Sequence, residues 1–118
     1  MIEVKQYCGD DFVFKKEEPS KEEIDKAHVG LNEAMKKMLS EEYDLIILDE
    51  VLVSIYFHLF NKQEIIDFVK ERPANVELIL TGRYCPEELI ELADLVTEMK
   101  EIKHYYTRGI TSRKGIEF

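Results

Sequence analysis

The sequence lacks the features that mark secreted, membrane-spanning and metal-binding proteins. It holds only two cysteines, Cys8 and Cys85, and neither has another cysteine or a histidine at metal-ligand spacing. No apolar run reaches the ~18 residues of a membrane-spanning helix, and no charged-then-apolar leader begins the chain. We therefore expect reduced, partly buried thiols and a soluble, cytoplasmic protein that binds no membrane.

Basic residues are outnumbered, and the short motifs of several enzyme classes are missing. The chain has 16 Lys and Arg against 25 Asp and Glu, so its formal net charge is −9. This charge argues against nucleic acid as the principal partner. No Ser-His-Asp order, CxxC pair, HExxH motif or phosphate loop GxxxxGK(S/T) occurs. A phosphate ligand would therefore need a cation to accompany it.

The most informative stretch is residues 43–50, YDLIILDE. Its four consecutive apolar residues are typical of a parallel strand covered on both faces, and Asp49 and Glu50 follow directly. Ligands of such sheets bind beyond the carboxyl ends of the strands, so these carboxylates could meet a metal-bound phosphate. Alternatively, they accept hydrogen bonds from the first amides of the next helix.

Three helices and a first strand are predicted around this stretch. Alternating residues at Ile2–Tyr7 predict a half-buried or edge strand. Capping boxes at residues 20–23 and 61–64 each begin an amphipathic helix, the second ending near Arg72. Residues 51–60 are almost wholly apolar and favour a short buried helix over a strand. His28 lies beside the apolar stripe of the first helix, and we expect a packed or boundary histidine there.

A second polar cluster follows the next predicted strand, residues 76–80. It consists of Thr81, Gly82 and Arg83, where glycine permits close backbone approach and arginine could contact a phosphate. Alternatively, Arg83 forms a salt bridge with one of the carboxylates at residues 49 and 50. A helix beginning at Pro86 and a last strand over residues 95–103 complete the prediction.

Two segments carry alternatives that the residues leave open. Residues 104–118 are the one basic segment of an acidic chain, and they form either a mobile tail or a strap that closes over an anion. Phe12 and Phe14 flank Val13 after a turn signal, and on the residues alone burial at the end of the core is favoured over an exposed position on a loop. With 118 residues, the chain is long enough for one α/β domain, residues 1–118, and too short for two. The order of its elements predicts a parallel sheet of about four strands.

Four stretches carry a resemblance to a known family: YDLIILDE, VELILTGR, PEELIELADLVTEMKEIKH and RGITSRKGIEF. Together they resemble roughly the carboxyl-terminal two-thirds of the P-loop-type ATP:cob(I)alamin (corrinoid) adenosyltransferases. The resemblance implies a RecA-like, three-layer α/β sheet with helices on both faces. It also implies transfer of the 5′-deoxyadenosyl group from ATP, bound with Mg²⁺, to the cobalt of a reduced corrinoid such as cobalamin, with release of triphosphate.

The resemblance also implies roles for residues at the two polar clusters. Glu50 matches the acidic residue that helps to hold the metal, with Asp49 beside it as a second metal ligand. Thr81, Gly82 and Arg83 match the segment near the nucleotide. Glu50 and Arg83 are the candidate catalytic residues.

Further residues are implied in the cofactor and substrate sites. Gly109, Lys114 and Gly115 fall in the tail that covers the ATP site. Phe12 and Phe14 fall in the loop that faces the lower side of the corrin ring, where Phe14 replaces the usual tryptophan.

The chain departs from the family pattern because the first strand and its phosphate loop are absent from these residues. One hypothesis is an adenosyltransferase that is impaired alone and needs a separate P-loop-bearing subunit or an oligomer. The other is a non-catalytic module that binds corrinoid or a family subunit. In both cases an apolar sheet edge is left unpaired, so we expect a homodimer or larger assembly.

Overall fold

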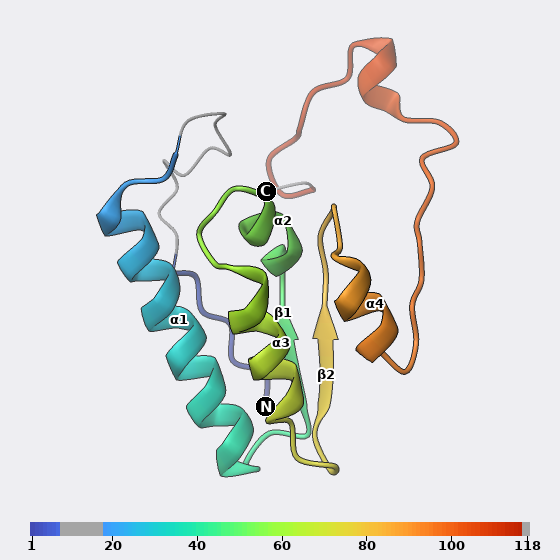
Figure 1. Ribbon diagram of the computed structural model, residues 1–118. Coiled ribbons are helices and arrows are strands. Elements are labelled where there is room, and N and C mark those ends of the chain that lie inside the picture. The colour runs from blue at the N-terminus through green and yellow to red at the C-terminus, as the bar shows by residue number, and fades with distance from the viewer. Residues whose placement is uncertain (8–17, 117–118) are drawn as a thin grey trace.

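The structure is a computed structural model of the chain, and it describes residues 1–7 and 18–116. Its elements are, in order, α1 (Lys21–Ser40), β1 (Leu45–Leu48), α2 (Val51–Tyr56), α3 (Lys62–Lys70), β2 (Glu77–Leu80), α4 (Glu87–Leu92) and the 3-10 helix η1 (Tyr105–Arg108) (Figure 1). No helix among these elements is long and apolar enough to cross a membrane.

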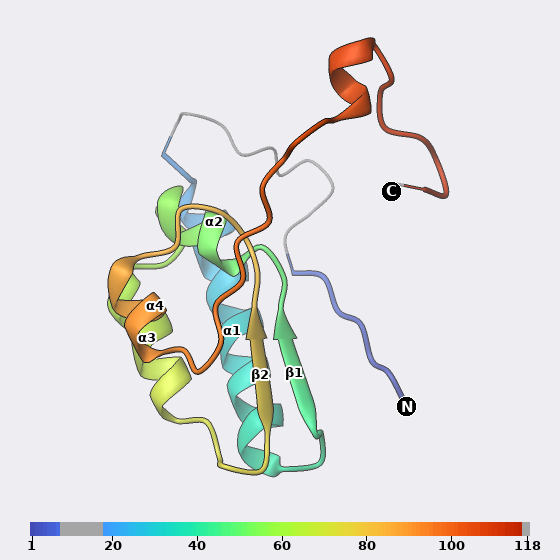
Figure 2. The ribbon, with the colours of Figure 1, turned by 90° about the vertical axis from the view of Figure 1, so that its right-hand side faces the viewer.

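The two strands form a parallel sheet in which Leu45 pairs with Glu77 and Leu48 with Leu80. Helices α1 and α3 cover one face, where Met38 and Phe68 pack against Ile46. Figure 2 looks onto the other side of the sheet, where no helix crosses the strands. The mixed α/β class is confirmed. The prediction of a strand buried on both faces is wrong for β1, because alternate residues face the uncovered side.

The two long helix starts follow the predicted caps. Ser20 donates its amide to Glu23 at 2.7 Å, and the Glu23 amide returns a bond of 3.2 Å to the Ser20 hydroxyl. Asn61 and Glu64 form the same reciprocal pair at 2.8 and 2.9 Å. Each box satisfies amide groups that the first turn of a helix leaves without an intrahelical partner. Residues 51–56 are helical, as favoured from their composition.

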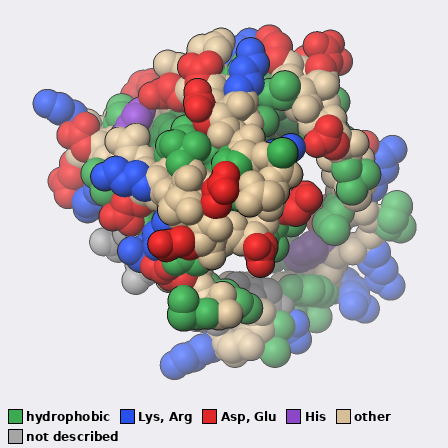
Figure 3. Space-filling model, turned by 90° about the horizontal axis from the view of Figure 1, so that it is seen from below, with side chains coloured by type: hydrophobic (Ala, Val, Ile, Leu, Met, Phe, Trp, Pro, Cys, Tyr) green, Lys and Arg blue, Asp and Glu red, His purple; other side chains and the backbone are tan. Residues whose placement is uncertain are grey.

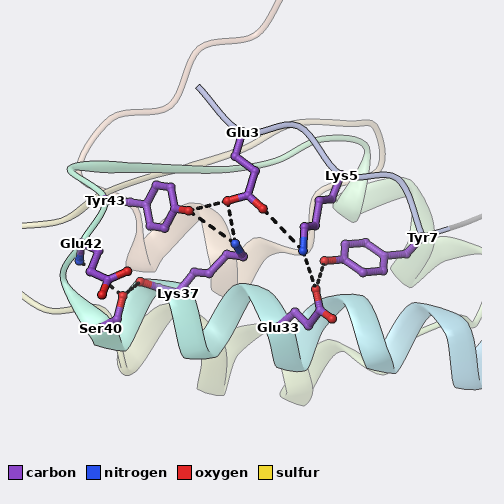
Figure 4. Close-up of polar contacts among 8 residues, drawn as sticks. All are labelled: Glu3, Lys5, Tyr7, Glu33, Lys37, Ser40, Glu42 and Tyr43. Carbon is purple, nitrogen blue, oxygen red and sulfur yellow. Dashed lines mark hydrogen bonds and ion pairs between the residues drawn. The ribbon is translucent and has the colours of Figure 1, made fainter. Parts of the chain in front are cut away.

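Residues 1–7 form no strand, contrary to prediction, and are held by side-chain contacts with α1 (Figure 4). Glu3 accepts hydrogen bonds from Lys37, at 2.7 Å, and from Tyr43. These bonds lower the pKa of Glu3 to about 2. Tyr7 donates to Glu33 and lies over Gly30, where an added Cβ would stand 2.6 Å from its ring. The alternation of apolar and polar residues in this segment therefore reflects polar side chains that face α1, and not a strand paired with a neighbouring backbone.

Residues 95–103 also form no strand, so within the described residues the sheet has two strands and not about four. Their apolar side chains are exposed, including Leu95, Met99 and Ile102. Apolar alternation does not create a strand where no neighbouring backbone accepts its hydrogen bonds. The chain then continues to η1, which lies beyond the end of the sheet where the strands finish (Figures 1 and 2).

The surface matches the acidic but mixed composition. From the end where the strands begin, acidic and basic side chains are interspersed around small apolar areas (Figure 3). Cys85 lies in the loop between β2 and α4 and is free, as expected, but exposed and not partly buried. Cys8 lies outside the described residues.

Candidate functional site at the carboxyl ends of the strands

The two predicted polar clusters meet at the carboxyl ends of β1 and β2 through Thr81. Its hydroxyl donates to Asp49 Oδ1 at 2.7 Å and accepts the Glu50 amide at 2.9 Å. Its backbone amide donates to the Leu48 carbonyl at 3.2 Å, and so continues the pairing of the strands by one residue. Thr81 thus fixes both acidic positions relative to β2.

Gly82 allows the beginning of α2 to pack directly against this turn. Its φ is +139°, and a Cβ built there would lie 2.8 Å from Leu52 Cβ and 3.1 Å from the Val53 nitrogen. The Leu52 amide donates to the Thr81 carbonyl at 3.2 Å. Only glycine satisfies both the positive φ and this close approach. Close backbone approach was predicted for Gly82, and the partner is α2.

Glu50 has left-handed backbone geometry, with φ 58° and ψ 18°, and is the residue before α2. Its side chain makes no capping hydrogen bond, so Glu50 does not accept hydrogen bonds from the first amides of α2, which was the alternative expectation. Both carboxylates are exposed. Left-handed geometry is uncommon for glutamate, and it turns the chain sharply between the end of β1 and α2.

Arg83 is exposed and, among the described residues, forms no ion pair with Asp49 or Glu50. The salt-bridge alternative is therefore wrong. The guanidinium stays available to an anion at the same end of the sheet. The structure thus gathers Asp49, Glu50, Thr81 and Gly82 into one turn and leaves Arg83 at its border.

An aromatic pair beside this turn was missed from the sequence. Tyr84 directly follows Arg83, and its ring stacks on Tyr56, at the end of α2, with centroids 4.1 Å apart and planes at 27°. Nothing in the sequence relates these two tyrosines, because their pairing depends on how α2 folds back over Gly82. The position of Tyr84 directly after the TGR segment was the one available signal.

Comparison with known proteins decides the family. The model of the family described as ATP:corrinoid adenosyltransferase BtuR/CobO/CobP matches residues 1–118. The chain belongs to this family.

Individual corrinoid adenosyltransferases are similar at moderate identity. The protein of Sinorhizobium sp is 32% identical over 111 residues, 93% of this chain and 51% of its own length. That of Escherichia coli K12 is 32% identical over 84 residues, 70% of this chain and 43% of its own. That of Pseudomonas aeruginosa is 29% identical over 110 residues, 93% and 54%. The chain spans about half the length of the curated relatives it matches.

The chemistry of the donor set decides how an adenosyltransferase metal would fit. Within residues 1–7 and 18–116, no three Asp, Glu, His or Cys side chains gather as a metal-binding group. Mg²⁺ is commonly bound by one or two carboxylates together with substrate phosphates and water. The pair Asp49 and Glu50 fits an ion that arrives with a triphosphate, and it does not fit a resident ion held by protein alone.

The remaining adenosyltransferase positions lie apart from the Thr81 turn or outside the described residues. Gly109 and Gly115 have positive φ, 85° and 81°, with no atom within 4 Å of an added Cβ. Lys114 is exposed. The tail lies beyond the carboxyl ends of the strands (Figure 1) and is not part of the Thr81 hydrogen-bond network. Phe12 and Phe14 lie outside the described residues.

Proposed function

We propose that the chain forms the carboxylate-bearing part of an ATP:corrinoid adenosyltransferase site. The observation that supports this most is the Thr81 turn in a member of the family, because it joins Asp49 and Glu50 to β2 at 2.7 and 2.9 Å. A ligand bound beyond the carboxyl ends of parallel strands would meet both carboxylates, Thr81 and Arg83 together.

The proposed reaction transfers the 5′-deoxyadenosyl group from ATP to a cob(I)alamin or related corrinoid. The electron pair of the reduced cobalt forms the bond to C5′, and the C5′–O bond breaks with its electron pair leaving on triphosphate. Mg²⁺ bound with ATP would supply charge neutralisation at the phosphates. Asp49 and Glu50 would hold that ion, and Arg83 would stabilise the negative charge that develops on the leaving group.

Further contacts are proposed at the borders of the site. Gly109, Lys114 and Gly115 would bring the basic tail over the triphosphate, since Lys114 is exposed and η1 lies at this end of the sheet (Figure 1). Phe12 and Phe14 would face the lower side of the corrin ring.

We further propose that residues 1–118 alone turn over poorly. These residues contain no GxxxxGK(S/T) loop, whose amides and lysine would surround the phosphates. Charge-assisted contacts of that class contribute about 1.5–3 kcal/mol each, and every ~1.4 kcal/mol changes a rate tenfold. Several missing contacts correspond to many orders of magnitude in rate.

A second candidate is a non-catalytic module that binds corrinoid or another family subunit. The uncovered face of the sheet supports it, because Leu45, Ile47 and Ile79 are 45%, 55% and 45% exposed there. Exposed apolar area of this kind commonly marks an interaction surface. A homodimer, a larger assembly or a separate P-loop-bearing subunit would each cover it.

The deciding experiment measures adenosylation of cob(I)alamin by the absorbance change that accompanies cobalt–carbon bond formation. We expect negligible turnover by the 118-residue chain and measurable turnover after a family fragment carrying the phosphate loop is added. Glu50→Ala should abolish the restored turnover. Glu41→Ala, which removes an exposed carboxylate at the end of α1, should not. Robust turnover by the chain alone would overturn the proposed need for the loop. No turnover with the fragment would favour the binding module.

A further inference from the structure

The stacked pair Tyr56–Tyr84 is the one exposed aromatic feature beside the Thr81 turn that the proposed chemistry leaves unexplained within the described residues. Tyr56 is 54% exposed and Tyr84 is 60% exposed. Phe57 meets Tyr56 edge-on, with centroids 5.1 Å apart. Neither phenol hydroxyl hydrogen-bonds to a described residue. The rings therefore stack in solvent without the burial that would make them part of the core.

Tyr84 also has an unfavourable backbone conformation. Its φ is +61°, in the left-handed region that bulky residues rarely adopt. Such a conformation is unfavourable for a tyrosine, and glycine at the same position would avoid its cost. The free energy gained from a solvent-exposed aromatic stack is no larger than this backbone cost. The stability of the fold therefore does not explain why residue 84 is a tyrosine.

The ring of Tyr84 has one face open to a ligand. Its other face rests on Tyr56 at a centroid distance of 4.1 Å, so an exposed fraction of 60% leaves the outer face in solvent. A flat ring could extend this stack, since aromatic faces bind one another in offset, near-parallel arrangements. Nucleobases bind tyrosine in this way with little sequence preference, because every base has a π-face.

The stack lies within reach of the phosphate end of the site. Tyr84 is three residues beyond Thr81, which bonds Asp49, so their Cα atoms are at most about 11 Å apart. Arg83 lies between them and pairs with no carboxylate in the described residues. With its base on Tyr84, one extended ligand would be long enough to place phosphate groups at Arg83 and at a metal ion held by Asp49.

We propose that the Tyr56–Tyr84 pair is a stacking platform for the adenine ring of ATP, with Tyr84 contacting the base and Tyr56 supporting it. This inference rests on the proposed function for the identity of the nucleotide. Tyr84 then determines specificity for a base-bearing triphosphate over triphosphate alone.

The test follows binding to the 118-residue chain by proton NMR, which detects weak binding at millimolar ligand. The three probes are ATP, adenosine and inorganic tripolyphosphate. We expect upfield ring-current shifts of adenine H2 and H8 with ATP and adenosine. Tyr84→Leu and Tyr56→Leu should each weaken ATP binding by about fivefold or more, while Tyr84→Phe keeps it. Tripolyphosphate has no carbon-bound proton, so its binding is followed by ³¹P NMR, and it should be equal in all four proteins.

Two further variants separate recognition from a structural role. Tyr84→Gly relieves the positive φ, so its melting temperature should be unchanged or higher although ATP binding falls. Leu39→Ala shortens an apolar side chain that is 49% exposed on α1, and should leave both quantities unchanged. A merely structural Tyr84 would show the opposite result, with lost stability and unchanged affinity per folded molecule.

The inference is overturned if Tyr84→Leu binds ATP as the unaltered chain does, or if neither ATP nor adenosine shifts the adenine resonances at millimolar concentration. Its failure is distinguishable from failure of the proposed function. Unchanged binding in Tyr84→Leu with cobalt–carbon bond formation in the fragment assay rejects only the platform. Adenine-dependent binding without any adenosylation in that assay keeps the platform and rejects the enzyme.

Discussion

The Thr81 hydroxyl donates to Asp49 Oδ1 at 2.7 Å while accepting the Glu50 amide at 2.9 Å, and so joins the two strand ends with one side chain. Thr81→Val removes both bonds but keeps the side-chain shape. We expect the free energy of unfolding to fall by about 2–4 kcal/mol, because a neutral hydrogen bond contributes about 0.5–1.5 kcal/mol and a bond to a carboxylate about 1.5–3 kcal/mol. Urea unfolding followed by circular dichroism measures this change.

The matched control is Thr81→Ser, which retains the hydroxyl and loses one methyl group. Its stability should stay closer to that of the unaltered chain than the stability of the valine variant does. Equal losses in both variants would mean that methyl packing, and not the hydrogen bonds, holds this turn.

Gly82→Ala should be the most destabilising single-methyl change at the site. The new Cβ would meet Leu52 Cβ at 2.8 Å and backbone at 3.1 Å, at a φ of +139°. We expect a loss of about 2–5 kcal/mol in the free energy of unfolding. Gly109→Ala is the control, because its φ is also positive but no atom lies within 4 Å. A small effect in both variants would show that α2 moves away freely.

Local signals in the sequence predicted the parts of the fold that depend on neighbouring residues. The capping residues Ser20 and Asn61 begin α1 and α3 as expected, since each box is complete within four residues. The strand ends at Asp49 and Thr81 also came together as expected, because parallel strands place their carboxyl ends at one edge.

Features that depend on distant partners could not be predicted. Residues 2–7 alternate as a strand would, yet their polar side chains pair with Glu33 and Lys37 on α1, about 30 residues away. The Tyr56–Tyr84 stack arises from the close packing of α2 on Gly82. A period of two reports which side chains share a face, and it does not report what that face contacts.

His28 is expected to make stability depend on pH. Its Nδ1 lies 2.8 Å from the Ile24 carbonyl, and its Nε2 lies 2.6 Å from Glu64 Oε1. Both partners are acceptors, so the doubly protonated ring satisfies both. The Ile24 carbonyl first, and then Glu64 and Asp25, raise the pKa of His28 above its usual value, while partial burial opposes them.

The sign follows from this raised pKa. The stabilisation by protonated His28 is fully present below its unfolded pKa of about 6.5 and is lost as pH rises through the higher folded value. We therefore expect the free energy of unfolding to fall as pH rises above about 6.5, and His28→Gln to flatten that slope. His58→Gln, at a histidine whose side chain is 69% exposed, should keep it. An unchanged slope in His28→Gln would contradict this assignment.

Ile47→Lys should weaken self-association, which we predict from the uncovered face of the sheet. Ile47 is 55% exposed on that face, between Leu45 and Ile79 across the two strands. A charge placed there would have to be desolvated in any interface that covers the face. Val29→Lys is the control, because Val29 is equally exposed, at 55%, but lies on α1. Sedimentation velocity at high micromolar concentration measures both, and a monomeric unaltered chain would contradict the prediction.

Glu50→Gly should separate the backbone role of this residue from its carboxylate. Glu50 and Glu41 have nearly the same left-handed geometry, with φ of 58° and 60° and ψ of 18° and 16°. Left-handed backbone costs a residue with a Cβ about 1–2 kcal/mol, and substitution by glycine removes this cost. About half of the stabilisation is then lost, because glycine raises the conformational entropy of the unfolded chain. Both glycine variants should therefore be as stable as the unaltered chain or more stable, by up to about 1 kcal/mol.

Only Glu50→Gly should lose the Mg²⁺-dependent part of ATP binding, because Glu41 lies at the end of α1, where the strands begin (Figure 1). Thermal melts and titrations of ATP with and without Mg²⁺ measure the two effects. If Glu50→Gly gained stability and kept the full Mg²⁺ dependence, the carboxylate would have no part in holding the metal, and the proposed site would lose its principal ligand.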